Sequence, residues 1–213
     1  MKRATLSLLS ISCLFLMGCG YTLQTSKGVA LKAEGVERIY IAPIKNKSFK
    51  PGVENLAYNK LVQVVAAGRQ VRLIDHPNEA DAILIGTVQQ ATYTPSNTTS
   101  ADSIYPLAPL RTTINIPVAT EYVADVICNF ELRRTSQVPI KEGVVLTAEN
   151  LKNPTPALWS SSFSRSKRFP GNNQKGEYGT TSPLINESEF DRALESIFKS
   201  MMQEVHESML AMF

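Results

Sequence analysis

Five side chains are the first candidates for chemistry: the cysteines Cys13, Cys19 and Cys128 and the histidines His76 and His206. Their spacing builds no nucleophile–base pair and no metal-ligand cluster, and the motifs HExxH, CxxC, GxSxG and a phosphate-binding loop do not occur. His76 falls in a turn, and His206 falls on the polar side of a C-terminal helical pattern. The sequence therefore predicts a protein that is not an enzyme and that needs no metal or cofactor.

Cys19 is the exception, because it directly follows a short apolar segment at the N-terminus. Lys2 and Arg3 precede an apolar run at 6–17, and the run ends in the sequence LMGC. This is the layout of a cleaved secretory signal, and LMGC resembles the lipobox of bacterial lipoproteins. The pattern predicts a signal peptide over residues 1–18 and a diacylglyceryl thioether on Cys19, the first residue of the mature chain. An ordinary signal peptide that is cleaved elsewhere is the alternative.

An acylated Cys19 would hold the chain on a membrane without a membrane-spanning helix. One acyl chain anchors a protein only marginally, whereas two or more hold it firmly. Gly20 stands where an aspartate would signal retention in the inner membrane of enteric bacteria. We therefore expect a lipid-anchored protein on the periplasmic side of the outer membrane, with residues 19–213 forming a single domain.

The charge balance limits the classes of partner, and the number of cysteines indicates what stabilises the fold. Cleavage after residue 18 removes two basic residues, so 20 basic residues face 19 acidic residues in the mature chain. This balance argues against a general polyanion binder, and we expect no nucleic-acid partner. Cys128 would be the only thiol left free, so an intramolecular disulfide cannot form and folding must depend on a hydrophobic core. A buried position in that core is the favoured interpretation of Cys128.

Hydrophobic periodicity predicts an α+β fold built as a two-layer sandwich. Apolar positions recur with helical spacing at 50–68 and again from Asn186, where Glu189 completes a capping box. Strand patterns occur at 38–46, within 71–93, at 121–134 and at 157–169. We expect a mixed sheet of about four strands with two amphipathic helices packed on one face. The proline-containing segment 94–121 is interpreted as a long loop or an extended excursion outside the core, and 136–157 as a second insertion.

Several of these segments, in this order, resemble the LPS-assembly lipoprotein LptE family. The matching stretches are GCGYTL at 18–23, RIYIAPIKNKSFKPGVENLAYNKLVQVVAAG, ADAILIGTV, YVADVICNFELRR, ALWSSSFS and the terminal amphipathic helix. The resemblance implies a domain that sits as a plug within the lumen of the LptD β-barrel. It also implies that the two proteins together insert lipopolysaccharide into the outer leaflet of the outer membrane.

A lipopolysaccharide site would need cationic side chains next to an amphipathic surface, because the ligand carries clustered phosphates. Arg133 and Arg134 end one predicted strand, and Arg165, Lys167 and Arg168 follow the aromatic residues of another. Arg165 and Lys167 share the parity of those aromatic residues, so we expect them to project together from the sheet beyond the core. Ordinary solvated charge at strand ends is the alternative interpretation for each residue.

A different class of outer-membrane lipoprotein remains open. A strand with the sequence IYIAP followed by an amphipathic helix also occurs in lipoproteins of the curli-secretion type and in activators of peptidoglycan synthases. Such a protein would be a binding or regulatory module that contacts a synthase or self-assembles, and it would not fill a barrel. An enzyme is the third and least favoured class.

Overall fold

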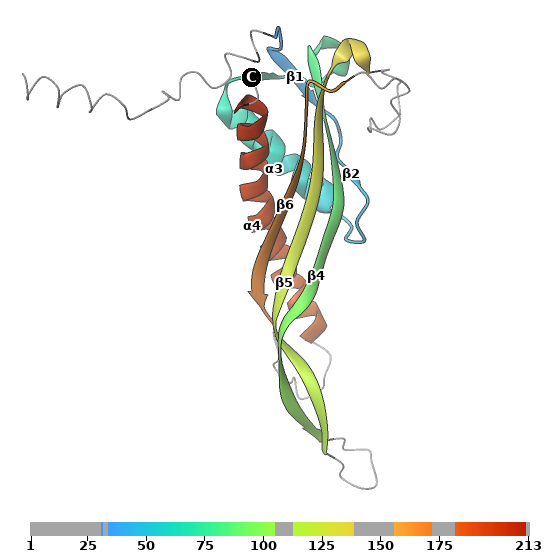
Figure 1. The fold of residues 1–213 in the computed structure, drawn as a ribbon, viewed down its shortest axis with the longest axis vertical. Helices are drawn as coiled ribbons and strands as arrows, with labels where there is room; N and C mark the ends of the chain where they lie inside the picture. Colours follow the sequence, from blue (N-terminus) through green and yellow to red (C-terminus); the bar gives the residue numbers. More distant parts are fainter. Residues whose placement is uncertain (1–30, 32–33, 105–112, 139–155, 172–181, 212–213) are drawn as a thin grey trace, which may run out of the picture.

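The structure, a computed structural model, describes residues 31, 34–104, 113–138, 156–171 and 182–211. In chain order its elements are β1 (Arg38–Ile41), β2 (Lys45–Asn46), α3 (Val53–Gly68), β3 (Arg72–Leu73), the short 3₁₀ helix η3 (Pro77–Glu79), β4 (Ala82–Ile104), β5 (Thr113–Arg134), η4 (Thr135–Gln137), β6 (Trp159–Pro170) and α4 (Ser182–Ala211). Both helices lie along one side of an elongated sheet (Figure 1).

The strands form one mixed sheet in the order β3-β1-β4-β5-β6, with β2 paired to β4 outside this path. β1 runs parallel to β3 and β4, and β2 runs parallel to β4. The long strands pair antiparallel with one another, β4 with β5 and β5 with β6. The predicted class is thereby confirmed: an α+β sandwich in which two helices cover one face of a mixed sheet.

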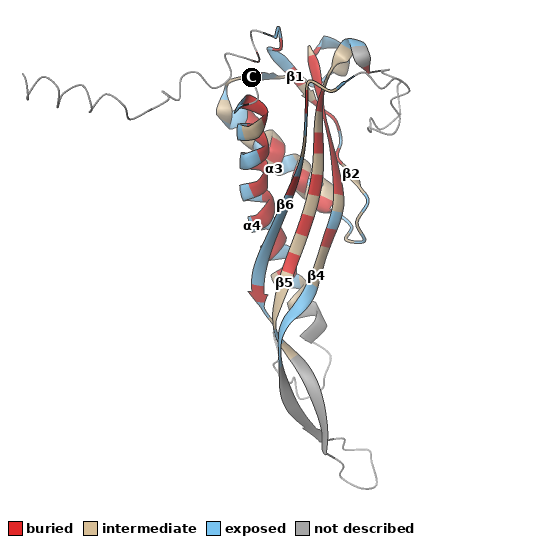
Figure 2. Ribbon diagram, in the orientation of Figure 1, coloured by how far each residue is buried: buried red, intermediate tan, exposed pale blue. Residues whose placement is uncertain are grey.

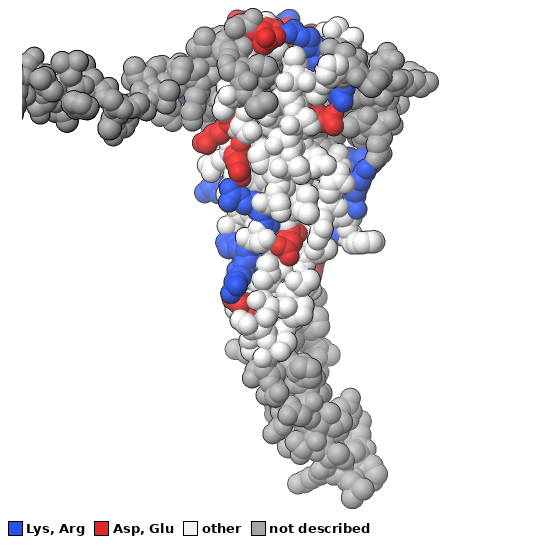
Figure 3. Space-filling view, viewed as in Figure 1, with Lys and Arg blue, Asp and Glu red and all other residues white. Residues whose placement is uncertain are grey.

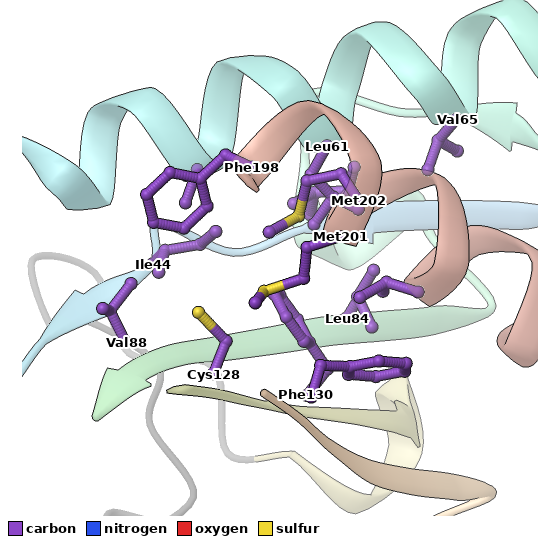
Figure 4. Packing of buried hydrophobic residues seen from close by; sticks show 14 of the residues in the cluster. Ile44, Leu61, Val65, Leu84, Val88, Cys128, Phe130, Phe198, Met201 and Met202 are labelled. Carbon is purple, nitrogen blue, oxygen red and sulfur yellow. The ribbon is translucent and has the colours of Figure 1, made fainter. Parts of the chain in front are cut away.

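The helix-covered face of the sheet is the hydrophobic core. Successive side chains of a strand point to opposite faces, and burial alternates along β5 accordingly (Figure 2). The buried residues of β5 are Ala124, Val126, Cys128, Phe130 and Leu132. Figure 4 shows Cys128 and Phe130 on the side of β5 that faces Met201 and Met202 of α4. The predicted core position of Cys128 is confirmed.

The described sheet has six strands, whereas the sequence predicted about four. β2 and β3 contain two residues each, which is too short to produce an alternating pattern. β2 pairs with β4 through Lys45 and Asn46, and β3 pairs with β1 through Arg72 and Leu73. β2 lies at the end of the strand pattern predicted at 38–46, and β3 lies in the first of the strand-like runs predicted within 71–93. Both therefore fall inside predicted segments, but each is a separate short strand held by a neighbouring strand.

The described part of 94–121 is an extended excursion and not a loop, so the second of the two interpretations holds for it. β4 continues to Ile104 and β5 begins at Thr113, and the two form a long antiparallel hairpin. β6 pairs with β5 only as far as the Glu121–Pro170 pair, so the hairpin beyond it has two strands. Proline is tolerated in such a ribbon because each strand has an edge that donates no ladder hydrogen bond. The register shift beside Pro95 fits this explanation.

Two details of the helices also differ from the predictions. α4 begins at Ser182, four residues before the predicted start at Asn186. His206 was predicted on the polar side of this helix, but it is buried. The reason is the close approach of α3, because a Cβ atom built on Gly68 would lie 2.4 Å from His206 Cε1. Glycine at this position lets α3 end directly against the imidazole.

The starts of β1 and β4 are joined by the carboxylate of Asp81. Its Oδ2 accepts hydrogen bonds from the backbone N–H of Glu37 at 3.1 Å and of Arg38 at 2.8 Å. Arg38 Nη2 also donates to Asp81 Oδ1 at 2.8 Å. The hydrogen bond from the Arg38 side chain is the largest cause that lowers the pKa of Asp81 below its ordinary value. The side chain of Asp81 therefore links the two strands.

The predicted signal peptide at 1–18, the lipidation site Cys19 and most of the predicted insertion at 136–157 lie outside the described residues. Among the helices that the structure does describe, none has the length and apolarity that a membrane crossing requires.

Candidate functional site

The basic residues of β6 lie along the margin where this edge strand runs beside α4. Figure 3 shows cationic side chains gathered along that margin, interspersed with acidic ones. Arg165 lies on the same side of β6 as the buried Trp159 and Phe163, as predicted from parity. Its Nε and Nη2 donate to Glu204 Oε2 of α4 at 3.1 and 2.6 Å. Both side chains are 47% exposed, so this ion pair is weakly held in water and open to exchange with another anion.

Arg165 and Lys167 do not project beyond the core, which corrects the prediction. Phe169 follows on the same parity and is buried. Its ring centroid lies 5.5 Å from that of Tyr122 and 6.1 Å from that of Phe190 on α4. The core therefore extends further along β6 than the sequence indicated, and the two cations sit at its edge between buried aromatic groups.

Arg168 points to the opposite face of the sheet from Arg165 and Lys167. Its Nη1 lies 3.5 Å from Glu121 Oε2 on the neighbouring strand, and its side chain is 70% exposed. Glu121 also accepts a hydrogen bond from Asn97 Nδ2 at 2.8 Å. Lys167 is exposed and makes no ion pair with another residue of the described chain. The three β6 cations thus surround one strand edge, two on the helix side and one on the other side.

Arg133 and Arg134 form a separate group at the far end of β5. Arg165 is paired with Val126, seven residues before Arg133, which corresponds to about 23 Å along a strand. Arg133 donates to Glu131 Oε2 at 2.8 and 3.0 Å, and Arg134 Nη2 lies 3.0 Å from Glu34 Oε2. The structure therefore divides the five predicted residues into two groups and does not gather them into one phosphate site.

The face of the sheet that the helices leave uncovered is called the open face below. Residues on β4, β5 and β6 that share this face include Ile83, Ile85, Thr87, Gln90, Thr92, Thr94, Val123, Asp125, Ile127, Asn129, Glu131, Arg133, Ser160, Ser162, Ser164, Ser166 and Arg168. Ile83 and Ile85 are buried there in a small apolar cluster with Ala42 and Val138. Apart from Ile83 and Ile85, most of these side chains are polar and uncharged, and the four β6 serines on this face are exposed. Ser166 Oγ donates a hydrogen bond to the carboxylate of Asp125 across the strands. Such a surface suits contact with a polar wall better than burial in an apolar interface.

Acid–base or metal chemistry has little support in the described part of the chain. Groups of three or more His, Cys, Asp or Glu side chains that could hold a metal ion do not occur among the described residues. Cys128 is fully buried, and burial raises the pKa of its thiol to about 12. A thiol with this pKa is almost entirely protonated at neutral pH and is a poor nucleophile. What the arrangement can do is present cations and hydroxyl groups to a ligand or partner.

One surface residue that sequence reasoning did not select is Phe49, in the connection between β2 and α3. Its side chain is 98% exposed, and it is the one large hydrophobic residue that is exposed among the described residues. The available signal was an aromatic residue within a run of polar, lysine-rich loop residues, KNKSFKPG.

Comparisons with known proteins give a fold likeness only. No protein-family model matches the sequence, and no curated protein sequence matches it. A PelC dodecamer from Paraburkholderia phytofirmans is similar in structure, with 16% identity, a TM-score of 0.39 and coverage of 81% of this chain and 87% of that chain. A protein described as a lipoprotein from Caulobacter crescentus has 10% identity and a TM-score of 0.40, covering 79% and 91% of the two chains. A protein from Xanthomonas campestris has 10% identity and a TM-score of 0.46, covering 83% and 85%.

Proposed function

We propose that this protein is an outer-membrane lipoprotein that plugs an LptD-like β-barrel and assists the transport and insertion of lipopolysaccharide into the outer leaflet. It would be anchored on the periplasmic side through acylated Cys19. The support for the anchor is the signal layout with LMGC at its end, together with the resemblance of the chain's ordered motifs to the LptE family.

The observation that carries the proposal is the polarity of the exterior. Apart from the buried Ile83 and Ile85, the open face consists mainly of hydroxyl and amide side chains, and Phe49 is the one large hydrophobic residue that is exposed among the described residues. Large barrels enclose a polar lumen that an internal domain can fill. An elongated domain with a polar surface, and with a β4–β5 hairpin that extends past the helices (Figure 1), is suited to contact the wall of such a lumen.

The proposed lipopolysaccharide contact is the strand edge that carries Arg165, Lys167 and Arg168. The Arg165–Glu204 pair is half-exposed, so a phosphate group could replace the glutamate at small cost. The guanidinium groups of Arg165 and Arg168 can bind a phosphate through two parallel hydrogen bonds. Arg133 and Arg134 would be a second, distant contact because of their position at the other end of β5.

Purification of the tagged, lipidated protein from solubilised outer membranes tests the partner. We expect a large β-barrel protein to co-purify in a fixed ratio. A homo-oligomeric ring without a barrel would contradict the proposal and would favour the self-assembling class of lipoprotein.

Charge reversal tests the lipid contact. We expect the combined change Arg165→Glu, Lys167→Glu and Arg168→Glu to weaken binding to purified lipopolysaccharide by about tenfold or more, because a hydrogen bond to a charged group contributes about 1.5–3 kcal/mol. Arg72→Glu is the matched control, because Arg72 is an exposed arginine on β3 at the opposite edge of the sheet. Unchanged binding of the triple variant would remove this site.

A further inference from the structure

The loop between β2 and α3 holds Phe49 in a fixed position while leaving its ring in water. The ring is 98% exposed, although phenylalanine normally gains free energy from burial. A single exposed aromatic residue is common on protein surfaces and by itself needs no explanation. The hydrogen bonds on both sides of Phe49 are what make this residue different.

The side-chain amide of Asn46 forms hydrogen bonds to several groups of the loop. Its Oδ1 accepts hydrogen bonds from the backbone N–H of Ser48 at 2.8 Å and from Ser48 Oγ at 2.7 Å. Its Nδ2 donates to the backbone carbonyl of Lys50 at 2.8 Å and to Glu54 Oε2 at 2.8 Å. The residues immediately before and after Phe49 are therefore tied to the same amide group.

Lys50 then fixes the loop to α4. Its Nζ forms ion pairs with Glu187 and, at 2.7 Å, with Asp191, and it lies 5.5 Å from the centroid of the Phe190 ring. The Lys50 side chain is only 18% exposed. The loop is thus ordered before any partner arrives, so docking of Phe49 would cost little conformational entropy.

We propose that Phe49 is an anchor residue that inserts into an apolar pocket in the wall of the barrel protein. This inference rests on the proposed function and identifies a contact for it. A protein pocket has a fixed shape, so it binds a preordered ring more tightly than a flexible one. A lipid layer is fluid, so preordering the ring would add little to its affinity for lipid. A lone phenylalanine is also a weak membrane anchor, and the neighbouring Lys50 is already neutralised by Glu187 and Asp191. The pattern of one buried aromatic anchor within a polar surround is typical of protein interfaces.

Affinity and stability measurements test the anchor together. We expect Phe49→Ala to weaken the purified complex with the barrel roughly 10- to 100-fold. The same variant should leave the unfolding midpoint of the isolated protein unchanged, because the ring makes no core contact. Phe49→Leu should recover part of the affinity, and the control Asn59→Ala, at an exposed position on α3, should change neither quantity. Equal affinity of Phe49→Ala and wild type would overturn the proposal.

A photo-crosslinking amino acid in place of Phe49, in the full lipidated chain in cells, identifies the occupant. We expect an adduct with the barrel protein, identified by mass spectrometry. If the barrel co-purifies with the wild type but the adduct is with lipid, a second copy or another segment of the chain, this inference fails and the proposed function stands. If the barrel does not co-purify at all, the proposed function fails, and the anchor fails with it.

Discussion

The two faces of β5 differ in burial and in polarity, although their residues alternate along one strand. Cys128 is fully buried against the helices, whereas its neighbour Asn129 is half-buried on the open face. The covered face is specified by volume and apolarity, because close packing penalises cavities and overfilling. Apart from the buried cluster that contains Ile83 and Ile85, the open face is polar and only partly buried within the described chain. Packing therefore constrains the residues on one side of the sheet more than those on the other.

The largest expected effect comes from placing the same charge on each face. We expect Cys128→Asp to destabilise the protein by more than about 5 kcal/mol, because it buries a carboxylate without a partner among apolar side chains. Asn129→Asp should change the free energy of unfolding by less than about 1 kcal/mol. Chemical denaturation of both variants measures the difference. Similar costs for the two variants would mean that the faces are not as different as the structure indicates.

Thiol reactivity sharpens the same comparison without disturbing the fold. Burial raises the pKa of Cys128 to about 12, so at pH 8 its thiolate fraction is about a thousandfold below that of an ordinary cysteine. We expect iodoacetamide to leave Cys128 of the folded, lipidated protein unmodified and to modify it after unfolding. In an Asn129→Cys variant the new thiol should react much faster. Rapid labelling of Cys128 in the native wild type would argue against a closed core.

A smaller effect is expected at the margin of the sheet, where Asp81 joins β1 and β4. We expect Asp81→Asn to lower stability by about 1 kcal/mol at pH 7, because hydrogen bonds to a partly exposed charged group are lost. The folded-state pKa of Asp81 is lowered, so its contribution is present above the unfolded pKa of about 4 and is lost as pH falls through the folded value. The stability difference between wild type and variant should therefore shrink below about pH 4. A difference independent of pH would contradict this.

Local sequence patterns predicted those helices and strands whose buried positions recur within one continuous segment. The alternation on β5 and the helical spacing of α3 and α4 come from positions close in sequence, and the buried site of Cys128 followed from them. The pairing of Arg165 with Glu204 joins residues that are 39 positions apart, so no local pattern reveals it. Burial of His206 depends on Gly68 in the other helix. The prolines of 94–121 left a loop and an extended excursion open, because proline disfavours central strands whereas a two-stranded ribbon has only edges.

The most direct test of the proposed role is depletion of the protein in its native bacterium, followed by quantification of lipopolysaccharide at the cell surface. We expect surface lipopolysaccharide to fall as the protein is depleted, and wild-type protein supplied in trans to restore it. Depletion that leaves surface lipopolysaccharide at its normal level would contradict a role in its assembly.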